Sequence, residues 1–198
     1  MHGSVGHLLW TGCYLAVLLG LSAYGVHRYV IIYLFWKNRK RDTHPLGHFE
    51  KLPMVTMQLP IFNEVYVVER LLKSVSEIDY PRELLQIQVL DDSTDDTRAL
   101  TQRCTLELQG RGFNVELIHR VDRTGFKAGA LETGLASAQG DFVCILDADF
   151  VPKPELLRET IHFFTDPKVG MIQTRWGHLN RTYSLLTRVQ AMFLDGHL

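Results

Sequence analysis

Paired carboxylates directly after short apolar runs are the residues of this sequence best suited to chemistry. Asp147 and Asp149 form an Asp-x-Asp triplet that follows the apolar run at 142–146. Two carboxylates held this close repel each other and favour a bound cation, and hard oxygen ligands select Mg²⁺ or Mn²⁺. Such an ion keeps positions open for phosphate oxygens, which indicates a nucleotide diphosphate ligand. The alternative is a turn whose carboxylates are simply solvated.

A second acidic pair, Asp91 and Asp92, follows the run at 86–90. The carboxylate of Asp92 is suited to accept a hydrogen bond from a base N–H, such as that of uracil or guanine. The competing interpretation is a helix start, because Ser93 or Thr94 would make a good N-cap.

An aromatic and a basic residue complete the set. Phe62 comes just after the run at 55–59 and is suited to stack on a base, although packing against a sheet would explain it equally. Lys127 lies between Gly125 and Gly129, where a helix is expected to begin. Free N–H groups at a helix start and a lysine ammonium both attract phosphate. The alternative is a solvated lysine between glycines that permit close packing.

Alternating strands and helices are expected to position these residues. Strands are expected at 55–59, 86–90, 115–119, 142–146 and 169–174, and helices at 63–78, 95–109, 127–138, 154–164 and 183–194. This alternation predicts an α/β fold with a mostly parallel sheet and helices on both faces. Ligands bind beyond the carboxyl ends of parallel strands. The residues that follow the predicted strands at 55–59, 86–90 and 142–146 should therefore converge at one edge of the sheet.

The N-terminal segment differs in composition from the rest of the chain. The 198 residues carry 21 basic and 22 acidic side chains, a net charge of −1 that gives no reason to expect nucleic acid as a partner. Only Arg28 is charged within residues 1–36, and the uncharged run at 8–26 would span about 29 Å as a helix. We therefore expect one transmembrane helix.

The charges after this helix predict its orientation. The basic stretch 37–41 follows the apolar segment, which places the later chain in the cytoplasm. A cleaved signal peptide would carry its positive charge before the apolar run instead. If the later chain is cytoplasmic, the glycosylation sequon at Asn180 is unused.

Several other site classes are excluded by their missing motifs. The sequence has no Walker loop, no G-x-G-x-x-G and no G-x-S-x-G, and the domain at 53–198 has no H-x-x-x-H or H-E-x-x-H histidine pair.

The motifs taken together resemble glycosyltransferase family 2, and within it the membrane-bound, cellulose synthase-like processive β-glycan synthases. The residues that carry this resemblance are QLPIFNE, QVLDDSTDDT, FKAGAL, ILDADF and QTRWGHLNRTYSLLTR. The resemblance implies a GT-A fold, a UDP-glucose or GDP-mannose donor, a divalent metal and inverting transfer of a hexose to a growing β-glycan. A lipid-linked acceptor and a binding fragment without catalysis are the alternatives.

The resemblance also implies roles for single residues on the nucleoside side of the site. Pro60, Phe62 and Glu64 match the family's nucleoside-binding segment after its first strand. Asp92 matches the aspartate that contacts the base, and Lys127 matches the basic residue near the base and diphosphate.

Asp147 and Asp149 match the family's D-x-D pair. They are expected to be catalytic, with Asp149 as the direct metal ligand and Asp147 toward the ribose or the metal shell. The T-E-D motif that supplies the family's catalytic base does not occur, and neither does Q-x-x-R-W, since the stretch 173–176 is one residue short of it.

Three segments are therefore expected. These are a transmembrane anchor at 1–36, a basic collar and linker at 37–52, and a GT-A domain at 53–198 that is incomplete at its C-terminal end. The chain is expected to bind donor but not to transfer sugar by itself.

Overall fold

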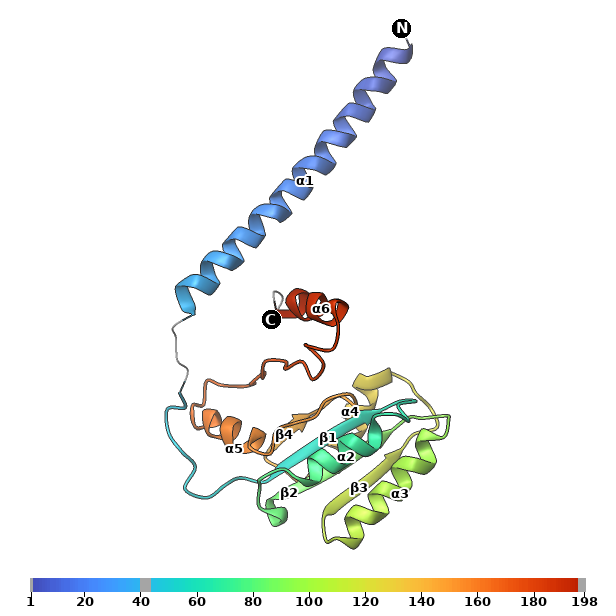
Figure 1. Cartoon of the computed structure of the whole chain (residues 1–198), viewed down its shortest axis with the longest axis vertical. Coiled ribbons are helices and arrows are strands. Elements are labelled where there is room, and N and C mark those ends of the chain that lie inside the picture. Colours follow the sequence, from blue (N-terminus) through green and yellow to red (C-terminus); the bar gives the residue numbers. More distant parts are fainter. Residues whose placement is uncertain (1, 40–43, 196–198) are drawn as a thin grey trace. The chain divides into compact units, whose positions relative to one another are not determined.

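The computed structural model describes residues 2–39 and 44–195, which fall into two compact units that divide between His44 and Pro45 (Figure 1). The first unit is the helix α1, His2–Asn38. Its segment Gly6–Asn38 is long and apolar enough to cross a membrane, as the sequence predicted. Lys40 and Arg41 of the predicted basic stretch lie outside the described residues.

The second unit contains one parallel sheet. Its strands are β1 (Val55–Ile61), β2 (Leu85–Asp91), β3 (Asn114–His119) and β4 (Phe142–Ile145), in the order β3-β2-β1-β4. The helices are α2 (Val68–Ser76), α3 (Thr97–Gly110), α4 (Phe126–Leu135), α5 (Leu156–Thr160) and α6 (Leu185–Asp195), with the 3₁₀ turns η1 (Arg82–Leu84) and η2 (Ile161–Thr165). The α/β fold class predicted from the sequence is confirmed.

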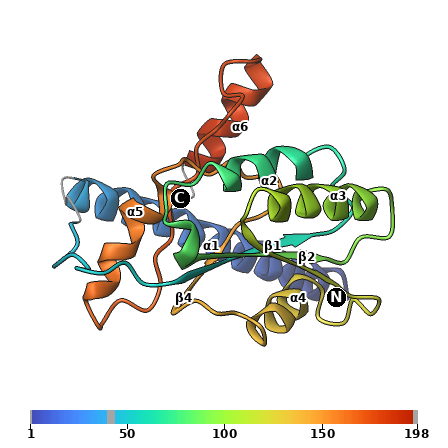
Figure 2. The same ribbon diagram turned by 90° about the horizontal axis from the view of Figure 1, so that it is seen from below.

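The two faces of the sheet are covered by different helices. Figure 2 shows α2 and α3 on one face and α4 on the other. Toward α2 and α3 the strands present buried apolar side chains, among them Met57 and Leu59 of β1 and Ile87 of β2. Strand residues alternate between faces, so the residues between these point toward α4.

The face under α4 is a buried polar network rather than an apolar surface. Gln58 donates to Gln88 Oε1 at 3.0 Å, and Gln88 donates to the Gly134 carbonyl at 2.9 Å and to Ser137 Oγ at 2.9 Å. A Cβ added at Gly134 would lie 2.6 Å from Gln58 Nε2, so this helix approaches the sheet too closely for a larger residue. Since buried amides must be paired, this network fixes where α4 sits on the sheet.

The crossover after β3 creates the place for a site. The chain passes from β3 through α4 to β4, which pairs with β1 on the side opposite β2. The strand order therefore reverses between β1 and β4, and such switch points leave a crevice at the carboxyl ends of the strands.

Three predicted elements differ from those observed. The predicted strand at 169–174 is wrong: this segment has no regular structure and Met171 is 80% exposed, because no strand of the described sheet pairs with it. The helix predicted from residue 63 begins at Val68, since Asn63 adopts a left-handed φ of 54° in the preceding loop. The predicted helix 154–164 is divided between α5 and η2.

Candidate active site

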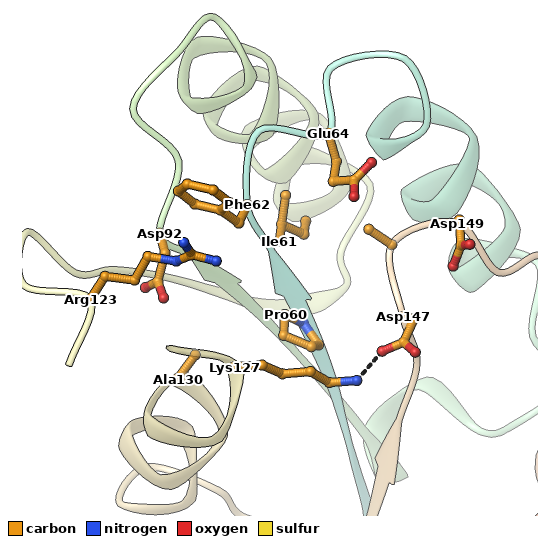
Figure 3. Close-up of a pocket in the computed structure, with 11 residues that line it drawn as sticks. Pro60, Ile61, Phe62, Glu64, Asp92, Arg123, Lys127, Ala130, Asp147 and Asp149 are labelled. Carbon is orange, nitrogen blue, oxygen red and sulfur yellow. Dashed lines mark hydrogen bonds and ion pairs between the residues drawn. The ribbon is translucent and has the colours of Figure 1, made fainter. Parts of the chain in front are cut away.

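A cavity of about 370 Å³ lies at the carboxyl ends of β1, β2 and β4 (Figure 3). Its lining residues are Pro60, Ile61, Phe62, Glu64, Asp92, Arg123, Lys127, Ala130, Asp147, Ala148 and Asp149. The structure therefore brings all seven residues predicted from the sequence around one cavity. Their individual roles stay predictions.

The two aspartates after β2 have different surroundings. Asp91 is fully buried and accepts hydrogen bonds from the Ser93 N–H at 2.9 Å and from Thr101 Oγ1 at 2.9 Å, so it stabilises the strand end. Asp92 lines the cavity, and its carboxylate accepts from Arg120 Nε at 2.8 Å and Nη2 at 2.5 Å. The hydrogen bond to Asp92 raises the pKa of the Arg120 guanidinium. Only Asp92 is available to a ligand.

The predicted capping role of Ser93 or Thr94 is wrong. The Ser93 hydroxyl accepts from the Asn63 N–H at 3.0 Å, and the Thr94 N–H donates to Asn63 Oδ1 at 3.0 Å. These bonds join the loops that follow β1 and β2. The first N–H of α3, that of Thr97, donates instead to Asp95 Oδ1 at 3.0 Å.

The start of α4 depends on two glycines. Gly125 has a left-handed φ of 74°, which glycine adopts without strain. A Cβ at Gly129 would lie 2.2 Å from the Thr124 carbonyl oxygen, so the loop folds directly onto the first turn of the helix. This places Lys127 at the cavity, where its ammonium forms an ion pair with Asp147 (Figure 3).

Arg123 is a cavity residue that the sequence analysis missed. Its guanidinium carbon lies 3.2 Å from the centre of the Phe62 ring and 5.2 Å from that of Phe126. A guanidinium over an aromatic face is a favourable cation–π arrangement. Arg120 was missed as well. Both arginines precede Lys127 by a few residues, in a segment where phosphate binding was expected. Their position beside Lys127 was the sequence signal that could have identified them.

The comparisons with known proteins agree with this geometry. Residues 58–192 match the model of the family described as glycosyl transferase family 2. The chain belongs to glycosyltransferase family 2. Its similarity extends to plant proteins of the cellulose synthase-like group, as the sequence motifs indicated.

Two plant relatives illustrate the extent of the similarity. Probable glucomannan 4-beta-mannosyltransferase 7 of Oryza sativa subsp. japonica is 41% identical over 150 residues, covering 73% of this chain and 26% of that protein. Glucomannan 4-beta-mannosyltransferase 2 of Arabidopsis thaliana is 38% identical over 182 residues, covering 85% of this chain and 34% of that protein. This family 2 chain thus spans about a quarter to a third of the length of these relatives.

A solved mannosyltransferase structure has the same fold. The mannosyltransferase PcManGT from Pyrobaculum calidifontis, in complex with GDP-Man and Mn²⁺, is 31% identical with a TM-score of 0.66. The match covers 78% of this chain and 45% of that one. The GT-A fold expected from the sequence is confirmed.

The carboxylates of this cavity fit a hard divalent cation. Asp147 and Asp149 both line the cavity and offer the oxygen ligands that Mg²⁺ and Mn²⁺ prefer. Within residues 2–39 and 44–195 the Asp149 carboxylate has no ion-pair partner, and only its backbone carbonyl is engaged, accepting from Arg70 at 3.4 Å. The Asp147 carboxylate is balanced by Lys127. The pair can therefore accept a cation without breaking a buried network.

Proposed function

We propose that this chain is the donor-binding part of an inverting mannosyltransferase that extends a β-glycan from GDP-mannose. The observation that carries the proposal is the single cavity, in which Phe62 and Asp92 lie at one end and Asp147 and Asp149 at the other (Figure 3). A nucleotide sugar has the same two ends, a flat base and a diphosphate. The names of the plant relatives and the GDP-Man bound to PcManGT support mannose over glucose and guanine over uracil.

Different residues of the chain are proposed to bind different parts of the donor. Asp92 accepts an N–H of the base, and the two hydrogen bonds from Arg120 fix the direction of its carboxylate. Phe62 and Pro60 form an apolar wall for the nucleoside, and Lys127 supplies a positive charge to the diphosphate.

Metal binding is assigned to the D-x-D pair. Asp149 would hold Mg²⁺ or Mn²⁺ directly, with Asp147 in or near its shell. Such an ion, when bound, supplies positive charge that stabilises the departing diphosphate. The loop after β4 carries both carboxylates, so the end of the strand sets their separation and direction.

The acceptor is proposed to be a glycan. The plant relatives are named for glucomannan, whereas no contact in the described residues favours a lipid-linked acceptor. A base must remove the proton of the attacking hydroxyl for the transfer to occur. We assign this role to no residue of the chain.

The glycosyltransferase domain is proposed to lie on the cytoplasmic side of the membrane. Lys37 and Arg39 follow the apolar part of α1, and positive charge is enriched on the cytoplasmic side of spans. The Arg39 guanidinium lies 4.0 Å from the Trp36 ring centre, a pairing suited to the membrane interface.

Calorimetric titration of the full chain in detergent tests the donor site. We expect Mn²⁺-dependent binding of GDP-mannose that is tighter than that of UDP-glucose. Asp149→Asn should weaken it at least about tenfold, as loss of a metal-site partner does. The control Glu132→Gln makes the same carboxylate-to-amide change at an exposed position of α4 and should leave binding unaltered. Absence of metal-dependent binding of either nucleotide sugar would show the proposal to be wrong.

A further inference from the structure

We propose that Arg123 reads the base of the donor nucleotide and selects guanine over uracil. The proposal rests on the donor site proposed above and adds to it the residue that decides which nucleotide is accepted.

The guanidinium of Arg123 is not satisfied by the protein. Its Nε is buried and has no hydrogen-bond partner, and none of the carboxylates in the described residues forms an ion pair with it. The guanidinium lies over the rings of Phe62 and Phe126, which offer no acceptor oxygen. Leaving the buried Nε–H unpaired away from water is costly. The two Nη atoms of an arginine carry four further N–H donors. A ligand with acceptor atoms would satisfy them.

Arg120 shows what a satisfied arginine looks like in the same loop. It donates to both carboxylate oxygens of Asp92 and to the carbonyls of Thr124 and Phe126, the latter two at 3.2 and 3.0 Å. The charge of Asp92 is thereby neutralised by Arg120 alone. The positive charge of Arg123, at the cavity wall, is not balanced by a carboxylate of the described residues.

The position of Arg123 indicates which part of the ligand it meets. In Figure 3 it lies beside Asp92 and Phe62, and Asp149 lies at the opposite end of the cavity. The diphosphate end already has its own cation in Lys127, which pairs with Asp147. Arg123 therefore belongs to the end that receives the base.

Guanine matches a carboxylate and an arginine placed side by side. Its N1–H and N2 amine donate to a carboxylate, and the neighbouring O6 and N7 accept the two parallel N–H groups of an arginine. A carboxylate has about four lone-pair sites, so Asp92 can hold Arg120 and still accept from a base. Uracil offers one ring N–H to the carboxylate, and beside it a single carbonyl oxygen where guanine has both O6 and N7. Only one of the two parallel N–H groups of the arginine would then have an acceptor.

Phe62 also prepares the guanidinium for this role. A guanidinium lying flat over a ring has its N–H groups directed sideways, in the layer above the ring. A base in that same layer meets the fork edge to edge. The aromatic contact thus fixes the plane in which an edge can be read.

The test uses three nucleotides with the full chain in detergent and Mn²⁺. GDP, UDP and 7-deaza-GDP, which lacks the N7 acceptor, are titrated into the wild type, Arg123→Gln and Arg123→Lys. We expect the wild type to bind GDP about 5- to 150-fold more tightly than UDP, the range of a good bidentate arginine–guanine pair. It should also bind GDP more tightly than 7-deaza-GDP.

Both variants should lose these preferences while still binding UDP. Lysine keeps the charge but not the fork, so Arg123→Lys separates edge reading from simple attraction. Arg98→Gln, at an exposed position of α3, is the matched control and should behave as the wild type.

The possible failures are distinguishable. If the wild type binds neither GDP nor UDP, the proposed function is wrong and this inference falls with it. The inference alone is overturned if the wild type binds GDP without preferring it to UDP or to 7-deaza-GDP. It is also overturned if Arg123→Gln keeps the preference, or loses GDP and UDP binding equally.

Discussion

Arg120 donates hydrogen bonds to both carboxylate oxygens of Asp92, at 2.8 and 2.5 Å, and so joins the end of β3 to the end of β2. The Asp92 side chain is only 4% exposed and that of Arg120 14% exposed. The same guanidinium binds the carbonyls of Thr124 and Phe126, and Phe126 has a left-handed φ of 49°. One arginine therefore orients Asp92, to which we assign base binding, and holds a strained loop at the start of α4.

Removing Arg120 should destabilise the fold. Arg120→Gln leaves the buried Asp92 carboxylate without its cation, and breaking a buried pair from one side costs about 3–5 kcal/mol. The free energy of unfolding from urea titration followed by circular dichroism measures this loss. The double variant Arg120→Gln/Asp92→Asn removes the stranded charge and should recover part of it. A double variant no more stable than Arg120→Gln would contradict this account.

Unlike the buried pair of Arg120 and Asp92, the ion pair between Lys127 and Asp147 should contribute little to stability. Their side chains are 52% and 42% exposed, and pairs this open contribute about 0–1 kcal/mol to stability. Lys127→Gln should therefore leave the urea midpoint nearly unchanged. It should weaken GDP binding about 10- to 100-fold, because the charged hydrogen bond that we propose between Lys127 and the diphosphate would be lost.

An exposed lysine outside the cavity supplies the control for this prediction. Lys153→Gln alters an exposed lysine that does not line the cavity, and it should change neither stability nor GDP affinity. If Lys127→Gln binds GDP as the wild type does, Lys127 does not contact the diphosphate.

The strand ends could be predicted from the sequence because the pattern is local. Short apolar runs followed at once by polar residues located Phe62, Asp92, Asp147 and Asp149, and the parallel topology brought them together. Hydrophobic periodicity carries this information residue by residue. The alternation of Gln86 and Gln88 with apolar residues in β2 was the unused signal for the polar face under α4.

The partners of these residues could not be predicted in the same way. Arg120 and Asp92 are 28 positions apart, and only the pairing of β2 with β3 brings them together. The difference between Asp91 and Asp92 depends on which side of the strand end each one faces. The segment at 169–174 has the composition of a strand, but composition does not reveal whether a sheet edge is available to pair with it.

The orientation of the chain in the membrane can be tested with its own sequon. Asn180 is exposed and begins an Asn-Arg-Thr sequence. If the domain is cytoplasmic, translation in the presence of microsomes should leave Asn180 unglycosylated. A sequon placed in an added N-terminal extension should be glycosylated in the same assay and serves as the positive control. Modification at Asn180 that Asn180→Gln abolishes would reverse the proposed orientation.

His162 should make the stability of the domain depend on pH. Its Nδ1 accepts the Phe49 N–H at 3.1 Å, and the His48 ring lies 4.5 Å away, centre to centre. Burial, followed by the charges of His48 and Arg158, lowers the pKa of His162 from its usual value. The neutral ring is therefore the form that the folded protein favours.

The sign of the pH effect follows from proton binding. Just below the ordinary histidine pKa of about 6.5, the folded domain binds fewer protons at His162 than the unfolded chain does. The contribution of neutral His162 to the free energy of unfolding is fully present above that pKa. It shrinks as the pH falls through it, and it stops changing below the folded-state pKa. Urea titrations at pH 7.5 and 5.5 should show this loss in the wild type and a smaller loss in His162→Gln.

Glutamine is the informative replacement because its carbonyl oxygen can still accept the Phe49 N–H without titrating. His7→Gln removes a histidine from α1, outside this cluster, and should retain the full wild-type pH dependence. Equal losses in the wild type and His162→Gln between the two pH values would mean that another group titrates.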